Sequence, residues 1–430
     1  MKNIAALMLL VCLAFAKAYS QQPSTTTFIH AGHLLDTKKG EWQTEMTLII
    51  EGNKIQSVQK GYKTPTGQIN LIDLKDQWVM PGFTDMHVHM ETEYNPHAYV
   101  QKYVDDPADV AYDSVKYAEI TLLSGFTTVR DLGGSGINIS LRDAINKGKV
   151  PGPRIFTAGK SIASTGGHAD PTNGSNQKLM GDPGPRQGVI NSPEEGREAV
   201  RHRYKNGADC IKITATGGVL SVAKNGSNPQ FTIEEIRSIT QTAADYGFHV
   251  AAHAHGDEGM RRAVEGGVKT IEHGTYMSEE TMDLMIEKNC YLVPTITAGK
   301  EVALKAEEEG FYPEVVVPKA REVGPQIQGT FARAYKRGVP IVFGTDAGVF
   351  AHGKNAKEFG YMVEAGMKPM EALQSATITP AIILNMENEI GQLQPGFYAD
   401  VVAVTENPEK NIAILEQIDF VMKDGVVFKN

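Results

Sequence analysis

The chain has 430 residues, of which 41% are hydrophobic, and it carries a formal net charge of −9. That length is sufficient for one α/β barrel with an accessory domain and a large buried core. The negative charge and the absence of a run of basic residues argue against a surface that binds the phosphates of nucleic acids.

The first twenty residues have the composition of an export signal. Lys2 supplies a positive charge, residues 4–15 are apolar, and Ala16 and Ala18 offer small residues for cleavage. The apolar run is too short to span a hydrocarbon layer of about 30 Å comfortably. We therefore expect a signal peptide over 1–20, no stable membrane insertion, and a periplasmic or secreted protein.

Both ends of the remaining chain have the pattern of short strands. Residues 47–55 read as strand, turn and strand, and residues 400–404 and 421–427 read the same way. The dipeptide Asp424-Gly425 is a hairpin signal. We expect the two ends to pair into one small β-sandwich outside the barrel, made from residues 21–80 and 386–430.

Between these ends, over residues 81–385, apolar strand-like runs alternate with helical patterns. The runs cover 82–90, 127–132, 155–161, 210–216, 250–255, 270–273, 291–297 and 341–346, and the helical patterns include 192–206, 232–246, 258–265 and 368–377. Thr232 and Glu235 form a capping-box signature. Eight strands alternating with helices predict an α/β fold, a TIM-like (β/α)8 barrel with its site at the carboxyl ends of the strands.

Six residues on these runs have the chemistry of metal ligands. His87 and His89 are two residues apart, so on a strand both imidazoles face one side and can reach one ion. The others are Lys212, His253, His273 and Asp346. Neutral imidazole and carboxylate suit zinc and similar ions. A buried lysine tends to lose its charge, and a neutral Lys212 amine beside metal ions can add carbon dioxide to form a bridging carbamate.

Each of these residues alone also has a structural explanation. A His-x-His pair can pack in a core, Lys212 can extend to the surface, and Asp346 can cap a turn. Their joint occurrence along barrel strands favours the metal site. Cys210 and Cys290 fall on different predicted strands, so buried free thiols are expected there.

The motifs resemble those of the amidohydrolase superfamily, and within it the prolidase and imidazolonepropionase-like group. They are PGFTDMHVH at 81–89, TVRDLGG at 128–134, Lys212, HAHG at 253–256, EHGT at 272–275, GTDAG at 344–348 and GQLQPGFYAD at 391–400. The resemblance covers essentially the whole mature chain. It implies a metal-dependent hydrolase barrel, a β-sandwich and a site for two zinc ions.

The resemblance also implies a role for each ligand. His87, His89 and Asp346 would bind one metal, His253 and His273 the other, and carboxylated Lys212 and a hydroxide would bridge them. Attack of that hydroxide would hydrolyse an amide without a covalent enzyme intermediate. Asp346 would take the proton of the hydroxide and pass it to the leaving amine.

Two further histidines are candidates for contact with substrate. His255 shares the inward face of its strand with His253, and His168 follows the glycines after the third strand. We assign both to the substrate's carbonyl or its terminal carboxylate, and the alternative is a hydrogen bond to a metal ligand. The role of Arg130 has two alternatives, which are binding of a substrate carboxylate and a structural ion pair with Asp131 or another acid.

The resemblance points to a small-molecule substrate with an amide bond to a C-terminal amino acid. Xaa-Pro dipeptides, N-acyl amino acids and ochratoxin-like amides are of this kind. The alternative is a cyclic amide substrate, as for imidazolonepropionase or dihydroorotase relatives. The predicted export signal argues against this alternative, because cytosolic catabolism would not need export. A non-catalytic metal-binding protein on the same barrel is a third hypothesis. A homo-oligomer is compatible with the sequence, which does not define the oligomeric state.

Overall fold

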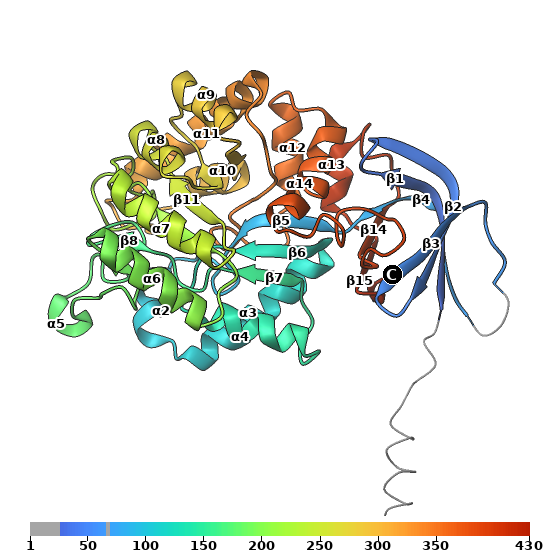
Figure 1. Cartoon of the computed structure of the whole chain (residues 1–430), viewed down its shortest axis with the longest axis horizontal. Coiled ribbons are helices and arrows are strands. Elements are labelled where there is room, and N and C mark those ends of the chain that lie inside the picture. The colour runs from blue at the N-terminus through green and yellow to red at the C-terminus, as the bar shows by residue number, and fades with distance from the viewer. Residues whose placement is uncertain (1–25, 66–68) are drawn as a thin grey trace, which may run out of the picture.

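The computed structural model describes residues 26–65 and 69–430, and the predicted signal peptide lies outside them. Figure 1 shows two parts, a sheet built from both chain ends and a larger body in which helices surround strands. None of the helices in the described residues is long and apolar enough to cross a membrane. Cys210 and Cys290 are buried and free, as predicted.

Both chain ends join one mixed sheet of seven strands. The strands are β1 (Thr27–Asp36), β2 (Glu41–Glu51), β3 (Lys54–Lys60), β4 (Asn70–Pro81), β14 (Val401–Val404), β15 (Phe420–Lys423) and β16 (Val426–Lys429). Their order is β16-β15-β14-β4-β1-β2-β3. The predicted hairpins are confirmed, β2 with β3 and β15 with β16, and β4 pairs with β14.

The terminal strands differ from the prediction in one respect, because hydrogen bonds join them into a single sheet instead of two packed sheets. Side chains from every strand of this sheet except β16 pack in one apolar cluster. The strands therefore share a core of their own, and alternating polar and apolar residues cannot by themselves distinguish this arrangement from a sandwich.

The body contains two parallel sheets in the predicted strand order. β5 (Phe83–Val88), β6 (Phe126–Asp131) and β7 (Arg154–Thr157) form one, and β10 (Ile211–Thr214), β11 (Val250–Ala254), β12 (Thr270–His273) and β13 (Tyr291–Val293) form the other. Single parallel bridges connect them. Ile162 pairs with Ile213, Leu292 with Ile341, and Val88 with Ala347, so the eighth run lies between β13 and β5.

The last two predicted strands are less regular than expected. The seventh run ends at Val293, and α10 (Ile296–Lys305) begins where the strand was predicted to continue. The eighth run makes single bridges in place of a ladder. Thr295 and Asp346 have φ angles of 50° and 63°, which interrupt extended backbone at both places.

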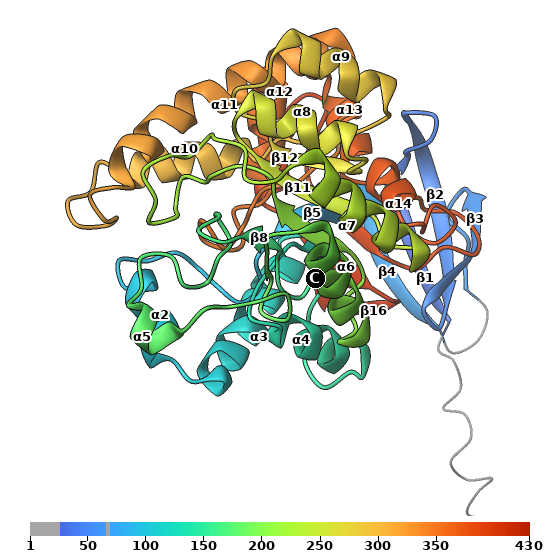
Figure 2. The same ribbon diagram turned by 60° about the vertical axis from the view of Figure 1, so that its left-hand side comes forward.

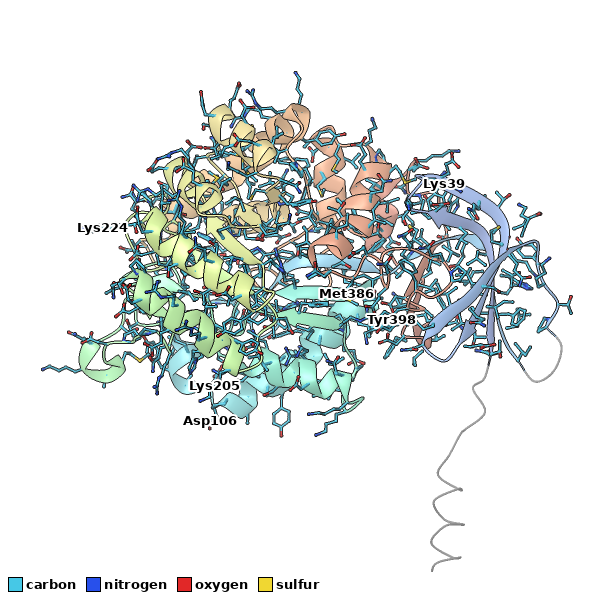
Figure 3. All side chains as sticks on the ribbon, in the orientation of Figure 1. Lys39, Asp106, Lys205, Lys224, Met386 and Tyr398 are labelled. Atoms are coloured by element: carbon cyan, nitrogen blue, oxygen red, sulfur yellow. The ribbon has the colours of Figure 1, made fainter. Side chains whose placement is uncertain are left out.

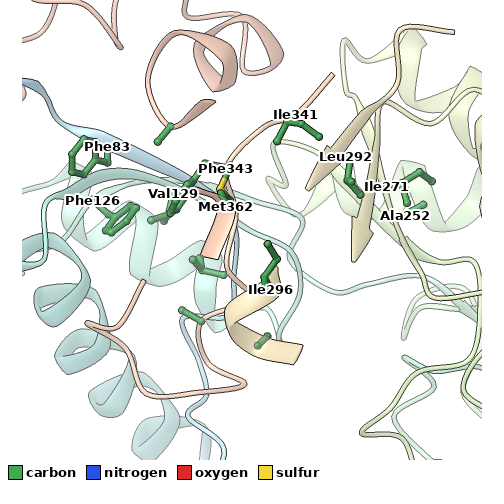
Figure 4. Packing of buried hydrophobic residues seen from close by; sticks show 14 of the residues in the cluster. Phe83, Phe126, Val129, Ala252, Ile271, Leu292, Ile296, Ile341, Phe343 and Met362 are labelled. Carbon is green, nitrogen blue, oxygen red and sulfur yellow. The ribbon is translucent and has the colours of Figure 1, made fainter. Parts of the chain in front are cut away.

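Helices cover the outside of the parallel strands (Figure 2). The predicted helices are confirmed as α6 (Pro193–Lys205), α7 (Ile233–Asp245), α8 (Asp257–Glu265) and α13 (Pro369–Ser375), and the capping box of Thr232 and Glu235 is present. The others are α2 (Ala98–Val104), α3 (Pro107–Leu123), α4 (Ile137–Asn146), α5 (Gln177–Met180), α9 (Glu279–Glu287), α11 (Val317–Arg337), α12 (Lys357–Glu364) and α14 (Ile378–Ile383). Figure 4 shows part of the core, with Phe83, Phe126 and Val129 on one side and Ala252, Ile271 and Leu292 on the other.

Arg154, at the start of β7, joins the body to the terminal sheet. Its guanidinium donates to Asp400 at 2.8 Å and to Asp424 at 2.6 Å. The same group lies 4.3 Å from the centroid of the Tyr398 ring, and Figure 3 labels Tyr398 at the junction of the two parts. The side chain of Arg154 is 14% exposed and that of Asp400 is 6% exposed.

We expect Arg154→Met to lower the free energy of unfolding by about 3 kcal/mol, because it leaves a buried carboxylate without its counter-charge. Thermal and denaturant unfolding of the purified protein would measure this change. Arg186→Met is the matched control, because the side chain of Arg186 is 75% exposed and its carboxylate partner is 3.9 Å away. Equal effects of the two substitutions would contradict the assigned role of Arg154.

Candidate metal centre

A cavity of about 260 Å³ lies at the carboxyl ends of the parallel strands. The residues that line it include all six predicted ligands and both further histidines, which are His87, His89, Lys212, His253, His273, Asp346, His168 and His255. The six ligands come from or follow β5, β10, β11, β12 and the eighth run. Parallel strands end on the same side of the body, which explains how residues so distant in sequence meet.

The ligand atoms form two groups. His87, His89 and Asp346 each offer one atom within 4.8 Å of the others, and so do His253, His255 and His273. The Oδ1 atom of Asp346 lies 3.2 Å from Nε2 of His89 and 3.4 Å from Nε2 of His87. The second group contains His255, which the sequence predicts to contact the substrate.

Lys212 lies beside the first group, with its Nζ atom 3.3 Å from Nε2 of His87. The ring centroids of His87 and His273 are 5.2 Å apart, so the two groups adjoin. Lys212 is buried, and burial lowers the pKa of its amine to about 8. A larger fraction of neutral amine is therefore present near neutral pH than for an exposed lysine.

Burial also sets the charge of the other ligands. It lowers the pKa of His87, His253 and His273 well below the usual value, and these imidazoles are neutral. Burial opposes ionisation of Asp346, but the hydrogen bond and charge of His89 and the charge of Lys212 hold the pKa of this carboxyl below its usual value. Its Oδ1 atom has no hydrogen-bond partner among the described residues.

The donor set fits divalent metal ions. It offers the neutral imidazoles of His87, His253 and His273, an ionised carboxylate with an unpartnered buried oxygen, and two groups of candidate ligand atoms side by side. Zinc and similar ions prefer these ligands. Positive φ angles at His273 (75°) and Asp346 (63°) accompany the site, and such conformations at non-glycine residues cost about 1–3 kcal/mol each.

Hydrogen bonds from neighbouring residues hold several of the candidate ligands. Nδ1 of His273 is 2.7 Å from Oγ1 of Thr295, and Nδ1 of His89 is 2.7 Å from the carbonyl oxygen of Gly133. The carboxylate of Asp85 accepts hydrogen bonds from the backbone N–H and the hydroxyl of Thr345, next to Asp346. Such partners fix the orientation of ligand side chains.

A buried ion pair supports His87. Its Nδ1 atom lies 2.9 Å from Oε2 of Glu272, while Oε1 of Glu272 accepts from Nη2 of Arg130 at 3.0 Å. Arg130 also donates to the carbonyl of Met86 at 2.8 Å and does not line the cavity. The structural alternative for Arg130 is confirmed, with Glu272 as the acid in place of Asp131. The sequence signal for Glu272 was an acidic residue inside an apolar strand.

We expect Glu272→Gln to weaken metal binding by roughly 10–100-fold, because an amide holds the His87 imidazole less well than a carboxylate. Competition with a chelator, followed by zinc analysis, would measure this affinity. Glu280→Gln is the control, since Glu280 is exposed at the start of α9. Unchanged zinc affinity in the Glu272 variant would contradict this support role.

His168 lies against the second group. Its ring stacks on that of His253 with centroids 4.3 Å apart, and its backbone N–H donates to Oε1 of Gln230 at 2.8 Å. A Cβ atom at Gly218 would lie 2.2 Å from this ring, so glycine permits the close approach. Burial lowers the pKa of His168 and of His255 to about 3. Both side chains are therefore neutral groups at the cavity wall.

The rest of the cavity wall is largely apolar. It includes Leu132, Val219, Leu220, Ala298, Val302, Val323, Ile327 and Val349. The sequence pattern does not distinguish these residues, because apolar side chains in loops and helices have the same pattern as core residues. Among the described residues that line the cavity, Lys212 is the one lysine or arginine.

Residues 78–428 match the model of the amidohydrolase family. The chain belongs to this family. The predicted membership is thereby confirmed, and the protein is a hydrolase. Ochratoxinase from Aspergillus niger is 31% identical to this amidohydrolase, over 95% of the chain and 88% of the relative.

Two solved structures extend the comparison. A Xaa-Pro dipeptidase with methionine bound in its active site is 53% identical, with a TM-score of 0.91, over 94% of this amidohydrolase and 100% of that chain. A prolidase complexed with N-methylphosphonate-L-proline is 32% identical, with a TM-score of 0.87 and the same coverage. These likenesses agree with the prolidase-like group that the motifs resemble.

Proposed function

We propose that this amidohydrolase cleaves the amide bond to a C-terminal amino acid in Xaa-Pro dipeptides, N-acyl amino acids or ochratoxin-like amides. The observation that carries the proposal is a cavity with two adjoining ligand groups and an otherwise largely apolar wall. The ligand groups suit hydrolysis, and the apolar wall suits a substrate side chain. The activities of the similar Xaa-Pro dipeptidase and ochratoxinase support the same substrate class.

The proposed cofactors are two divalent metal ions, zinc in the first instance. His87, His89 and Asp346 would hold one, His253 and His273 the other, and carboxylated Lys212 would lie between them. When bound, such ions lower the pKa of water and polarise a carbonyl. Carboxylation joins the neutral Lys212 nitrogen to the carbon of carbon dioxide and releases a proton.

Asp346 is the proposed general base. Its carboxylate is ionised, lines the cavity and has an oxygen without a hydrogen-bond partner. It would take a proton from the attacking water and return it to the leaving nitrogen. His168 and His255, as neutral imidazoles, would donate hydrogen bonds that orient the substrate's carbonyl or terminal carboxylate.

Hydrolysis of a matched panel of amides tests this function. The zinc-loaded protein is given dipeptides and N-acyl amino acids with C-terminal proline, phenylalanine or leucine, each with a free or a blocked carboxylate. Release of the amino acid from the free-carboxylate substrates alone is the expected result. Equal cleavage of the blocked substrates would contradict recognition of the carboxylate.

The same panel separates the two alternatives. Opening of cyclic amides without cleavage of any linear amide would indicate a cyclic amidohydrolase. A fully metal-loaded protein that cleaves none of these compounds would indicate a metal-binding protein without this catalysis.

A further inference from the structure

Lys319, on α11, contacts the loop that follows β10. Its Nζ atom donates to the carbonyl oxygens of Gly218 at 3.1 Å, Ser221 at 2.8 Å and Ala223 at 2.8 Å. A lysine ammonium has three N–H donors, so this one side chain is fully used on a single loop. We call residues 217–223 the wall loop.

A second helix also holds the wall loop. The hydroxyl of Tyr99 on α2 donates to the carbonyl oxygen of Leu220 at 2.8 Å. Figure 2 shows α11 and α2 on different sides of the body, so helices far apart in sequence hold the loop between them. Within the loop, the Ser221 hydroxyl donates to the Gly218 carbonyl at 3.0 Å.

The wall loop supplies part of the apolar cavity wall. Val219 and Leu220 line the cavity together with Val302 of α10 and Val323 of α11. Val219 is 7% exposed and packs in one cluster with these two valines. The base of the loop also reaches the second ligand group, because the Gly217 carbonyl lies 3.0 Å from Nε2 of His253.

No acid pairs with the Lys319 ammonium among the described residues, and its three hydrogen bonds all go to backbone carbonyls. Burial lowers the pKa of this amine to about 8. Partial burial of a charged ammonium group costs free energy, and here its hydrogen bonds go to one loop alone. This cost indicates that the position of the loop is important for function.

We propose that Lys319 is a positioning residue for substrate selection, which holds Val219 and Leu220 as a wall for an uncharged, apolar side chain of the substrate. The inference rests on the proposed function and adds this substrate preference to it. In an apolar pocket, one additional methylene group on the substrate changes kcat/KM by roughly 10–200-fold. Loss of the hydrogen bonds to the loop should therefore lower selectivity for large apolar side chains.

Four dipeptides, Ala-Ala, Ala-Leu, Leu-Ala and Leu-Leu, test the inference with the zinc-loaded protein. In Lys319→Met we expect the ratio of kcat/KM for the better leucyl substrate over Ala-Ala to fall roughly tenfold, mainly through a higher KM. Lys319→Arg should recover part of the ratio, because guanidinium also donates several hydrogen bonds. Lys336→Met is the control, since Lys336 is an exposed lysine on the same helix.

A ratio in Lys319→Met equal to that of the wild type would overturn the inference. An equal loss on all four dipeptides would overturn it as well, because that result indicates general structural damage. Zinc content is measured in every variant, so that a loss of metal is recognised.

Amide hydrogen exchange of peptides that cover 217–223 gives a second readout, which needs no substrate. Faster exchange in Lys319→Met, with near wild-type exchange in Lys319→Arg, is expected. Unchanged exchange would show that Lys319 does not hold the loop. If the wild type cleaves neither these dipeptides nor any amide of the functional panel, the proposed function fails, while the exchange experiment still decides the role of Lys319.

Discussion

Lys212→Ala is expected to lose bound metal and turnover together. The Lys212 amine is buried 3.3 Å from the His87 imidazole of the first group, and alanine cannot form the proposed bridging carbamate. Loss of a direct ligand should exceed the roughly 10–100-fold fall in metal affinity that follows loss of a supporting residue. Zinc per chain, measured by elemental analysis, and hydrolysis of the amide panel would test this.

The carbamate itself can be observed directly. Wild-type protein grown with carbon-13-labelled bicarbonate should give a carbamate signal in NMR that Lys212→Ala lacks. Lys336→Ala serves as the control for removal of a lysine. Two zinc ions per chain and full activity in Lys212→Ala would refute the bridging role.

Asp346→Asn is expected to lower kcat by roughly 10²–10⁴-fold while the fold remains intact, because the amide cannot accept a proton from water. Asparagine has nearly the same shape and tolerates positive φ better than most residues, so it should keep the 63° conformation of this position. Steady-state kinetics at saturating zinc, with circular dichroism and thermal unfolding, would separate catalysis from stability.

The exposed Asp245, at the end of α7, provides the matched control. Asp245→Asn removes a carboxylate of the same type without touching the cavity, and its kcat should equal that of the wild type. A near-normal rate in Asp346→Asn would mean that another group accepts the proton.

The local sequence pattern was sufficient to predict most of the strands and helices of the body and the candidate metal ligands. The first six strand-like runs are buried in parallel sheets, and the residues with metal-binding chemistry converge on one cavity. This agreement has a physical reason. Apolar strands must be buried, and in a parallel arrangement their carboxyl ends share one side. Residue types and their positions on the strands therefore indicated the site.

Long-range contacts explain what the pattern missed. Thr295 is β-branched and would be expected in a strand, yet its φ is 50°. The buried carboxylate of Glu358 accepts hydrogen bonds from the backbone N–H groups of Ile296 and Thr297. These hydrogen bonds fix the first turn of α10, which begins directly after Thr295. The partners Arg130 and Glu272 are likewise distant in sequence, and no local signal pairs them.

The position of β14 in the terminal sheet has a consequence for the order in which the protein can fold. β4 pairs with β14, so Met80 lies opposite Val402 and Pro81 opposite Val401. β4 leads after one residue into β5, which carries His87. The strand that precedes the first candidate ligands can therefore find its partner β14 only when almost the entire polypeptide has left the ribosome. Contacts of such sequence separation form slowly. We therefore expect the site to mature late during biosynthesis, and truncations at the C-terminus to damage metal binding as well as the sheet.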